Sequence, residues 1–502
     1  MGKLIKIAVL LIIAVSAFGL NGSIESIGEI RVLNLWGSWE EMGYAHGYLL
    51  GAEFLSFYEG YFLEFAGGIY NVNLARNYFN QYFEVPPEFA DYASGIITGA
   101  ADTVSLYSSV YNRDIDVLDL YIVSSAPDLS ALVDFQQMYC SSVSAWGNAT
   151  QKDPSLAGSP AISRNLDYYV DTAESILEKS LIITHDPEIG QDWISISFPG
   201  YMGCLSGMNE TGISIALNMG NYSGTSITSP KFVPIGMAIA LGLAESDFDN
   251  SGACDIGDLM AATIEWNRSN TFALHLNAPT GLGYSGALGI VPEVNNHRGE
   301  AFRYVEDEPS IAPDRIIVTN HHRVLYPPIT CSRYSRLTDS LETNPDVNLE
   351  RLWGFMGAVG GVPIPGVGGT LQTMIFQQDQ RRIGLAFSSS GVAAYQKTPE
   401  WIEWSDIYPN HVQESIEDEF IQPILMQVYP NPTSSILNVT AVISEVNQLE
   451  VFDLAGRQVP VTFLETSSNQ FTADISDFDA GLYFVTNDAY QNGERVSFLV
   501  LK

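Results

Sequence analysis

The stretch MYCSSVSAWGNATQKDPSLAGSPAISRNLDYY, residues 138–169, is the part of the sequence that decides the fold. It contains Cys140, followed by two serines, and a later Arg-Asn-Leu-Asp box with Arg164 and Asp167. A thiol becomes a useful nucleophile when a nearby cation and hydrogen-bond donors stabilise the thiolate, and Arg164 is a permanent cation. A lone cysteine is more often a buried core residue, so the residues alone leave both interpretations open.

The spacing inside the Arg-Asn-Leu-Asp box limits what the box can do. If residues 161–167 form a strand, side-chain alternation places Asp167 on the opposite face from Arg164. A bulge or the end of the strand is then needed for both side chains to serve one site. The spacing alone therefore does not establish a catalytic constellation.

Composition excludes some classes of partner. The 502 residues carry 23 basic and 58 acidic side chains, a net charge of −35. Nucleic acids and anionic membrane surfaces require clustered lysine and arginine, so we expect neither as a partner. The four cysteines, Cys140, Cys204, Cys254 and Cys331, are too few for a disulfide framework in a chain of this length.

The N-terminus predicts an exported protein. Residues 1–19 have two lysines, an apolar run and small residues near the end, which is the pattern of a signal peptide. The run is too short to cross a bilayer well, and no later segment predicts an integral membrane span.

The remaining chain divides into four segments. Residues 20–139 show apolar residues at helical spacing and predict a mainly helical segment. Residues 140–405 contain many short strand-like runs between glycine, asparagine and proline, which predicts an α+β domain with largely antiparallel sheets. Residues 406–424 are an acidic linker, and residues 425–502 predict a small all-β sandwich.

The order of motifs from about residue 30 to residue 395 resembles that of the N-terminal nucleophile (Ntn) hydrolases. The closest branch is the acyl-CoA:6-aminopenicillanic acid acyltransferase group, peptidase family C45, with its choloylglycine hydrolase relatives. The resemblance implies a four-layer αββα fold after a pro-segment and no cofactor for catalysis. Its motifs are WGSWEEMGYAHG (36–47), CSS (140–142), SRNLD (163–167), GMNETGISIALN (207–218), TN (319–320), SRYSR (332–336) and GTLQTMIF (369–376).

The same resemblance implies a role for each matching residue. Autoproteolysis between Tyr139 and Cys140 frees the α-amine of Cys140, which then acts as the general base for its own thiol. Arg164 and Asp167 orient the nucleophile. Asn218 is the candidate oxyanion donor. Asn320 and Arg333 are candidates for holding the site and the leaving group, with Arg336 as the alternative arginine.

The residue before the cysteine departs from the family pattern. Family precursors that cleave themselves often carry a small residue there, and this chain carries Tyr139. If the bond before Cys140 persists, catalysis lacks the free amine. The alternative hypothesis is therefore a secreted, calcium-stabilised binding or adhesion protein with a degenerate Ntn fold.

The C-terminal segment resembles the type A sorting domain of the type IX secretion system. The matching residues are YPNP (429–432), DLAGR (453–457), GLY (481–483) and the terminal Lys502. The resemblance implies that the type IX secretion machinery is a partner and that the protein is secreted or attached to the cell surface.

A second distinctive stretch, DFDNSGACDIGDL (247–259), predicts a calcium loop. It resembles a single dockerin or EF-hand loop, because side-chain oxygens recur at the ligand positions and Gly252 permits the sharp turn. The alternative is an acidic turn that caps a helix starting near Asp258. The candidate ligands for a structural Ca²⁺ are Asp247, Asp249, Ser251, Asp255 and Asp258.

The sequence therefore predicts a secreted cysteine Ntn hydrolase or acyltransferase. The expected substrate is a small molecule with a linear, non-peptide amide bond or an acyl donor, and the sequence does not select among such substrates.

Overall fold

The computed structural model describes residues 20–136, 138–220, 231–308, 311, 313–408, 427–429, 433–440, 449–453, 457–467, 470–487 and 494–500. The predicted signal peptide and most of the predicted linker lie outside these residues. The chain divides into two compact units, residues 1–412 and 413–502. Among the described residues, no helix has the length and apolar character needed to cross a membrane.

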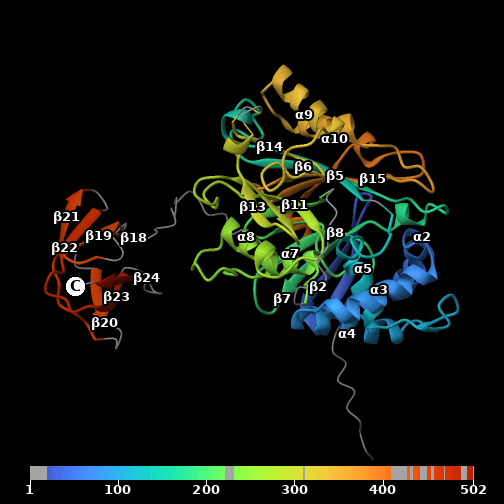
Figure 1. Cartoon of the computed structure of the whole chain (residues 1–502), viewed down its shortest axis with the longest axis horizontal. Coiled ribbons are helices and arrows are strands. Elements are labelled where there is room, and N and C mark those ends of the chain that lie inside the picture. The colour runs from blue at the N-terminus through green and yellow to red at the C-terminus, as the bar shows by residue number, and fades with distance from the viewer. Residues whose placement is uncertain are drawn as a thin grey trace, which may run out of the picture. The chain divides into compact units, whose positions relative to one another are not determined.

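Two stacked sheets form the centre of the larger unit (Figure 1). The first has the strand order β1-β2-β7-β8-β9-β10-β11-β12-β13, and the second has the order β14-β5-β6-β15-β16-β17. The strands of the first sheet are β1 (Gly22–Ile27), β2 (Ile30–Gly37), β7 (Leu181–Pro187), β8 (Trp193–Ser197), β9 (Ser206–Asn209), β10 (Ser214–Met219), β11 (Thr271–Asn277), β12 (Gly289–Asn295) and β13 (Gly299–Arg303). Those of the second are β14 (Arg315–Val318), β5 (Tyr139–Ala145), β6 (Ala161–Tyr168), β15 (Gly369–Gln377), β16 (Arg382–Phe387) and β17 (Glu400–Glu403).

Helices cover the outer face of each sheet. Figure 1 shows α9 (Ser332–Thr343) and α10 (Leu349–Val359) on one side of the stacked sheets, with α3 (Ile69–Tyr82) and α4 (Pro87–Ala101) on the other. The remaining helices are α1 (Trp39–Phe57), the π-turn Tyr58–Phe62, α2 (Leu63–Phe65), α5 (Val117–Ser124), α6 (Ala126–Leu129), α7 (Ile235–Ala244), α8 (Ile256–Ile264) and α11 (Trp404–Ile407). The order of layers is therefore helices, sheet, sheet, helices, and the predicted αββα architecture is confirmed.

Apolar clusters hold these layers together, and three of them bear on the site. Between the sheets, Val32 and Ile194 of the first pack in one cluster with Met374 and Phe376 of the second. A second cluster joins α9 and α10 to the smaller sheet. The largest joins the helices before residue 139 to residues of the strands after it, and it includes Cys140 itself. The two sides of the Tyr139–Cys140 bond thus share one hydrophobic core.

The N-terminal segment is mainly helical, as predicted, but it begins with two strands. β1 and β2 form an antiparallel hairpin, and β2 pairs in parallel with β7, so residues before Cys140 extend the large sheet. Ile30, Val32, Leu33 and Leu35 are buried in β2. The acidic linker also begins later than predicted, because α11 and Tyr408 are part of the larger unit and the Tyr408 hydroxyl donates to the carbonyl of Trp193 (2.7 Å).

Glycines allow an unusually close approach of α1 and α4. A Cβ atom added at Gly43 or Gly47 of α1 would overlap backbone atoms of α4, and one added at Gly95 or Gly99 would overlap backbone atoms of α1. The GxxxG spacing places these glycines on one face of each helix. Larger side chains at these positions would force the two helices apart.

The smaller unit is an all-β sandwich, as predicted. One of its sheets has the order β18-β19-β22-β21 and the other has the order β20-β23-β24. Leu437, Val451, Phe471 and Phe498 pack in its apolar core. Residues 430–432, 454–456 and 502 of the sorting motifs lie outside the described residues. The strands are β18 (Gln427–Tyr429), β19 (Ile436–Thr440), β20 (Leu449–Asp453), β21 (Phe463–Ser467), β22 (Gln470–Asp474), β23 (Gly481–Asn487) and β24 (Glu494–Val500).

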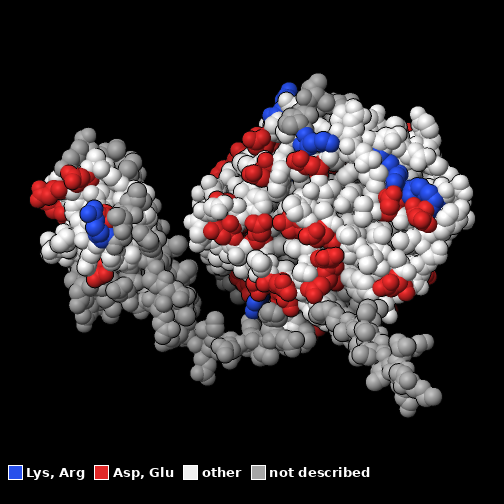
Figure 2. Space-filling view, turned by 90° about the horizontal axis from the view of Figure 1, so that it is seen from below, with Lys and Arg blue, Asp and Glu red and all other residues white. Residues whose placement is uncertain are grey.

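Carboxylates gather on the surface of the larger unit. Figure 2 shows them in a curved band on one face, with only a few separate lysine and arginine side chains. On that face, the distribution of charge agrees with the expectation that nucleic acid is not a partner.

Candidate active site

Cys140 lies near the start of β5, on the face that points toward the large sheet. It pairs with Leu166 of β6, and its Sγ atom accepts a hydrogen bond from Nη2 of Arg164 (3.2 Å). Cys140 is only 2% exposed. Substrate therefore cannot reach the sulfur in this state of the chain without a movement of the residues around it.

Arg164 connects the two sheets beneath the cysteine. It is fully buried on β6, and its guanidinium donates to the carbonyl oxygens of Leu205 and Leu217 and to the hydroxyl of Ser206. None of the ion pairs among the described residues gives Arg164 a carboxylate partner. A buried cation whose hydrogen bonds among the described residues go to neutral oxygens favours a negative charge nearby, and the Cys140 sulfur is within hydrogen-bonding distance.

Asn320 and Arg333 hold the peptide group of Cys140. The Cys140 backbone N–H donates to Oδ1 of Asn320 (3.1 Å), while Nδ2 of Asn320 donates to the carbonyl of Met219 (2.8 Å). Arg333 of α9 donates from Nη2 to Asn320 Oδ1 (2.6 Å) and from Nη1 to the Cys140 carbonyl (2.6 Å). Arg336 instead donates to the carbonyl of Ala358 (3.3 Å). Of the two candidate arginines, Arg333 contacts the cysteine.

Asp167 reaches the site from the end of β6. Its Oδ1 accepts from the hydroxyl of Thr370 (2.5 Å), and its Oδ2 lies 3.9 Å from Nη1 of Arg333. The register shift beside Asp167 lies in β15, between Thr370 and Gln372, so the alternation of β6 is unbroken and Asp167 points away from the large sheet, toward Arg333 of α9. Burial raises the pKa of Asp167 to about 6, although Thr370, Arg333 and Arg164 each lower it.

Asn218 is near the site but does not contact Cys140 in any hydrogen bond among the described residues. Its Nδ2 lies 3.4 Å from both the Ser142 hydroxyl and the Ala216 carbonyl. Its Oδ1 is buried and has no partner among the described residues. The structure thus brings Arg164, Asp167, Asn320 and Arg333 to Cys140, and places Asn218 beside the next inward-facing residue of β5.

The uncleaved chain holds Cys140 as a thiol rather than a thiolate. Burial raises its pKa, and the negative charge of Asp167 adds to this, while Arg164 and Arg333 oppose the shift. Tyr139 is 39% exposed, with its ring 5.5 Å from the Arg333 guanidinium carbon. A large residue before the cysteine therefore projects outward beside Arg333 instead of filling the site.

The acidic loop forms a partial cluster. Oxygen atoms of Asp247, Asp249 and Asp258 lie within 4.8 Å of one another. Asp255 instead caps α8, accepting from the Gly257 N–H (2.6 Å), and the Ser251 hydroxyl accepts from the Ala253 N–H (3.3 Å). Three of the five predicted ligands therefore converge in a way that suits a hard cation, while the helix-capping alternative describes both Asp255 and Asp258, whose Oδ2 accepts from the Asp255 N–H (3.0 Å).

Calcium binding by this loop remains a prediction. At a Ca²⁺ concentration 100 times the dissociation constant, binding stabilises the fold by about 2.7 kcal/mol, a rise of about 3 °C in the melting temperature of the larger unit. Calorimetric scans with Ca²⁺ and with excess chelator measure this difference. Asp249→Asn should abolish the difference, while Asp255→Asn should lower both temperatures equally. Equal melting temperatures for the unaltered protein would rule out the ion.

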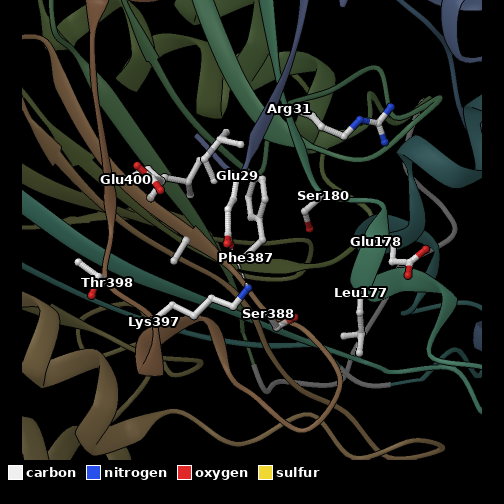
Figure 3. A pocket seen from close by; sticks show the side chains of 13 residues that line it. Glu29, Arg31, Leu177, Glu178, Ser180, Phe387, Ser388, Lys397, Thr398 and Glu400 are labelled. Atoms are coloured by element: carbon white, nitrogen blue, oxygen red, sulfur yellow. Dashed lines mark ion pairs between the residues drawn. The ribbon is translucent and has the colours of Figure 1, made fainter. Parts of the chain in front are cut away.

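A cavity of about 500 Å³ opens beside β16 and β17, which form the edge of the second sheet that is farther from β5 (Figure 3). Register pairs Cys140 with Leu166, Leu166 with Gln372, and Gln372 with Phe387, which lines this cavity. Figure 3 shows Lys397 and Glu29 as an ion pair there (3.6 Å). The cavity has charges of both signs, and none of the residues that surround Cys140 lines it.

Sequence reasoning missed one buried residue of this region. His275 of β11 contacts the hydroxyls of Ser142 and Ser144, the next two inward-facing residues after Cys140 on β5. A lone histidine in an apolar strand gives no signal by itself. The one signal in the sequence is the Ser-x-Ser spacing after the cysteine, which places Ser142 and Ser144 on the same face of the strand as Cys140.

Comparisons with known proteins match different parts of the chain. A stretch of 216 residues, 40% of the chain, is 28% identical to an uncharacterized protein from Archaeoglobus fulgidus, and the chain spans only about a third (34%) of that relative. Similar solved structures include the Caenorhabditis elegans ortholog of N-acylethanolamine-hydrolyzing acid amidase. The two sequences are 14% identical, the TM-score is 0.35, and the match covers 52% of this chain and 100% of that chain.

Two further solved structures are similar to the same extent. A mutant of the conjugated bile acid hydrolase from Clostridium perfringens has 13% identity and a TM-score of 0.33, covering 52% of this chain and 92% of that one. Penicillin V acylase from Agrobacterium tumefaciens has 12% identity and a TM-score of 0.34, and the match covers 53% of this chain and 87% of that one. Likeness at this level carries no argument about activity, so the case for a function depends on the site itself.

The family match at the C-terminal end is of a different kind. Residues 427–502 match the family described as the secretion system C-terminal sorting domain, which covers the two small sheets. This agrees with the predicted export of the protein. The C-terminal unit of this chain is a secretion system sorting domain.

Proposed function

We propose that this chain is a secreted amide hydrolase or acyltransferase of the Ntn type, with Cys140 as its nucleophile and autoproteolysis before Cys140 as its activating step. The observation that supports this proposal most is that Cys140 makes two separate contacts, one through its sulfur and one through its backbone nitrogen. Arg164 donates to the Cys140 sulfur, and Asn320 accepts from the Cys140 backbone nitrogen. The nucleophile and the nitrogen that would become its base each have a dedicated partner.

The activating step forms one thioester and opens one peptide bond. The Cys140 sulfur attacks the carbonyl carbon of Tyr139, the bond from that carbon to the Cys140 nitrogen breaks, and the nitrogen takes the thiol proton. Water then hydrolyses the thioester, leaving a carboxylate on Tyr139 and a free thiol and amine on Cys140.

The same groups would then act on a substrate amide. The free α-amine takes the thiol proton, the thiolate attacks the acyl carbon, and the amine leaving group departs with that proton. Water completes hydrolysis, and an acceptor nucleophile in its place completes acyl transfer. Asn320 and Arg333 lie where the α-amine would be held, and Asn218 would serve the oxyanion.

Intact mass and N-terminal sequencing of the purified secreted protein test the activating step. We expect two chains, one ending at Tyr139 and one starting at Cys140. They should co-purify and separate only in denaturant, because the two sides share the core cluster around Phe65, Phe135 and Tyr168. An unbroken chain through Tyr139–Cys140 that is inactive toward N-acyl amides would overturn the proposal and favour the binding-protein alternative.

The pH profile is expected to fall on the acid side near pH 6. The pKa of Asp167 is about 6 because burial raises it, so its negative charge is lost as the pH falls through that value. The same raised pKa means that protonation of Asp167 stabilises the fold at low pH, and this stabilisation disappears as the pH rises through about 6. Rates on an amide substrate measured from pH 4 to 9 test the expected loss of activity below about pH 6. The Asp167→Asn protein should not show this dependence on pH. An unchanged dependence would assign it to another group.

A further inference from the structure

Glu293 of β12 holds the loop that follows Asn320. The side chain is fully buried, and its carboxylate accepts from the backbone N–H groups of Arg323 (2.8 Å), Val324 (2.9 Å) and Leu325 (2.9 Å). Hydrogen bonds to a carboxylate are stronger than those between neutral groups, so these contacts fix the loop backbone. Arg323 follows Asn320 by three residues, and the chain after Asn320 is therefore anchored.

Arg303 of β13 anchors the chain before Asn320. Its Nη1 donates to the carbonyl of Ile317 (3.1 Å), which precedes Asn320 by three residues. Its Nε lies 3.1 Å from Oε1 of Glu293, so the two buried side chains form an ion pair. Asn320 thus lies between two positions that are fixed by one pair of charges.

Glu308 connects this pair to the helix that carries Arg333. Its Oε1 lies 3.2 Å from Nη1 of Arg303 and 3.1 Å from Nε of Arg323, and its Oε2 accepts from the Tyr334 hydroxyl (2.8 Å). Burial and the charge of Glu308 raise the pKa of Tyr334, so the phenol keeps its proton and donates. Tyr334 follows Arg333 directly in the first turn of α9.

These contacts make one buried cluster, whose members are Glu293, Arg303, Glu308, Arg323 and Tyr334. A buried ion pair is by itself weak evidence for stability, because the cost of taking charges out of water can exceed their attraction. The cluster does fix geometry, because Asn320 and Arg333, which both contact the backbone of Cys140, are attached to it.

Glu308 joins the two attachments. Arg333 donates to Oδ1 of Asn320 (2.6 Å), and the same oxygen accepts from the Cys140 nitrogen (3.1 Å). We propose that Glu308 is a positioning residue that acts on Cys140 through Tyr334. Its contact with the phenol sets the first turn of α9 and so keeps Arg333 beside Asn320, where the cysteine nitrogen is held. The inference rests on the proposed function, in which that nitrogen becomes the general base.

Two substitutions in the mature protein test the chemical effect, Tyr334→Phe and Glu308→Gln. The first removes one hydroxyl and keeps the ring in the apolar cluster, and the second removes the charge and keeps the shape of the side chain. Each is expected to lower kcat on a fluorogenic N-acyl amide about 10-fold with little change in KM, because a displaced positioning group costs rate more than binding. The Tyr334→Phe/Arg333→Ala protein should have the kcat of Arg333→Ala alone, because both changes act on one group.

A similar cluster in the N-terminal segment supplies the matched control. Asp119 is fully buried, pairs with Arg76 (2.5 Å) and Arg113 (2.6 Å), and accepts from the Tyr58 hydroxyl (2.5 Å). Tyr58→Phe therefore removes the same kind of contact from a carboxylate with two arginine partners. It should lower the melting temperature to a similar extent but leave kcat within about 2-fold.

A second readout needs no catalysis and follows the cysteine nitrogen directly. In the uncleaved Cys140→Ala protein, deuterium exchange at the backbone N–H of residue 140 is measured by mass spectrometry with electron-transfer fragmentation. This N–H donates to Asn320, so added Tyr334→Phe should speed its exchange about 10-fold, while added Tyr58→Phe should leave it unchanged.

The outcomes separate the inference from the proposed function. If Cys140→Ala retains activity, or the unaltered protein hydrolyses no N-acyl amide, the proposed function fails, and the exchange rate still decides whether Tyr334 positions the nitrogen. Equal losses of kcat for Tyr58→Phe and Tyr334→Phe, or an exchange rate at residue 140 that Tyr334→Phe does not change, would overturn the inference alone.

Discussion

Replacing Cys140 by alanine is expected to abolish both activities assigned to the site. The chain should remain unbroken between residues 139 and 140, and the rate on amide substrates should fall by about 10⁴-fold or more, because no other group forms the acyl intermediate. Intact mass measures the first effect, and initial rates with fluorogenic N-acyl amides measure the second. The fold should persist, since alanine leaves the Asn320 contact to the backbone nitrogen in place.

A second thiol provides the matched control for this variant. Cys254 is half-buried in the acidic loop, with its sulfur 3.6 Å from Oε1 of Gln191. Cys254→Ala removes a thiol that lies outside the site and is less buried than Cys140, so cleavage and activity should stay unchanged. Cleavage that continues in the Cys140→Ala protein would mean that another group, or a separate protease, opens the chain.

Replacing Arg164 by leucine is expected to damage stability and chemistry together. Three buried acceptors, the carbonyls of Leu205 and Leu217 and the Ser206 hydroxyl, lose this donor. The Leu205 carbonyl still accepts from the N–H of Leu217 (2.9 Å), so two acceptors depend on Arg164. Each buried acceptor without a partner costs about 1–3 kcal/mol, so the free energy of unfolding should fall by about 2 kcal/mol or more. The pKa of Cys140 should rise further, because Arg164 lowers it more than any other neighbouring group does.

Urea denaturation measures the stability of the Arg164→Leu protein, and the rate of thiol alkylation against pH measures the pKa of Cys140. Arg164→Lys is the control, because it keeps the charge but cannot span the acceptors on β9 and β10 with one nitrogen. It should restore part of the thiol pKa and little of the stability. If the leucine variant matches the unaltered protein in both measurements, Arg164 neither stabilises the fold nor lowers the pKa of the Cys140 thiol.

The sequence predicted several residues that the structure places around Cys140, but it did not predict how the first strands of the chain pair. Strand alternation predicted that Asp167 faces away from Arg164, and the position of Asp167 beside Arg333 of α9 agrees with this, while Arg164 contacts the large sheet. The motif order also located Asn320 and Arg333, which lie on different elements that no local pattern connects. The site roles themselves remain predictions until the variants are measured.

The missed features depend on pairing between distant strands. The hairpin of β1 and β2 was included with the helices that follow it, and its parallel partner β7 begins only at Leu181. His275 becomes part of the site only because β11 lies beside β10 and across from β5. Periodicity describes the face of one element, and it contains no information about which element packs against that face.

The parallel pairing of β2 with β7 has a consequence for solubility. If the N-terminal piece left after cleavage, β7 would become an exposed edge strand, with unpaired N–H and C=O groups along the buried, apolar residues Ile182 and Ile183. Such an edge is a template for pairing with another copy of the chain. The β1–β2 hairpin therefore covers the edge of β7, and loss of the N-terminal piece after cleavage would expose that edge to pairing with another copy of the chain.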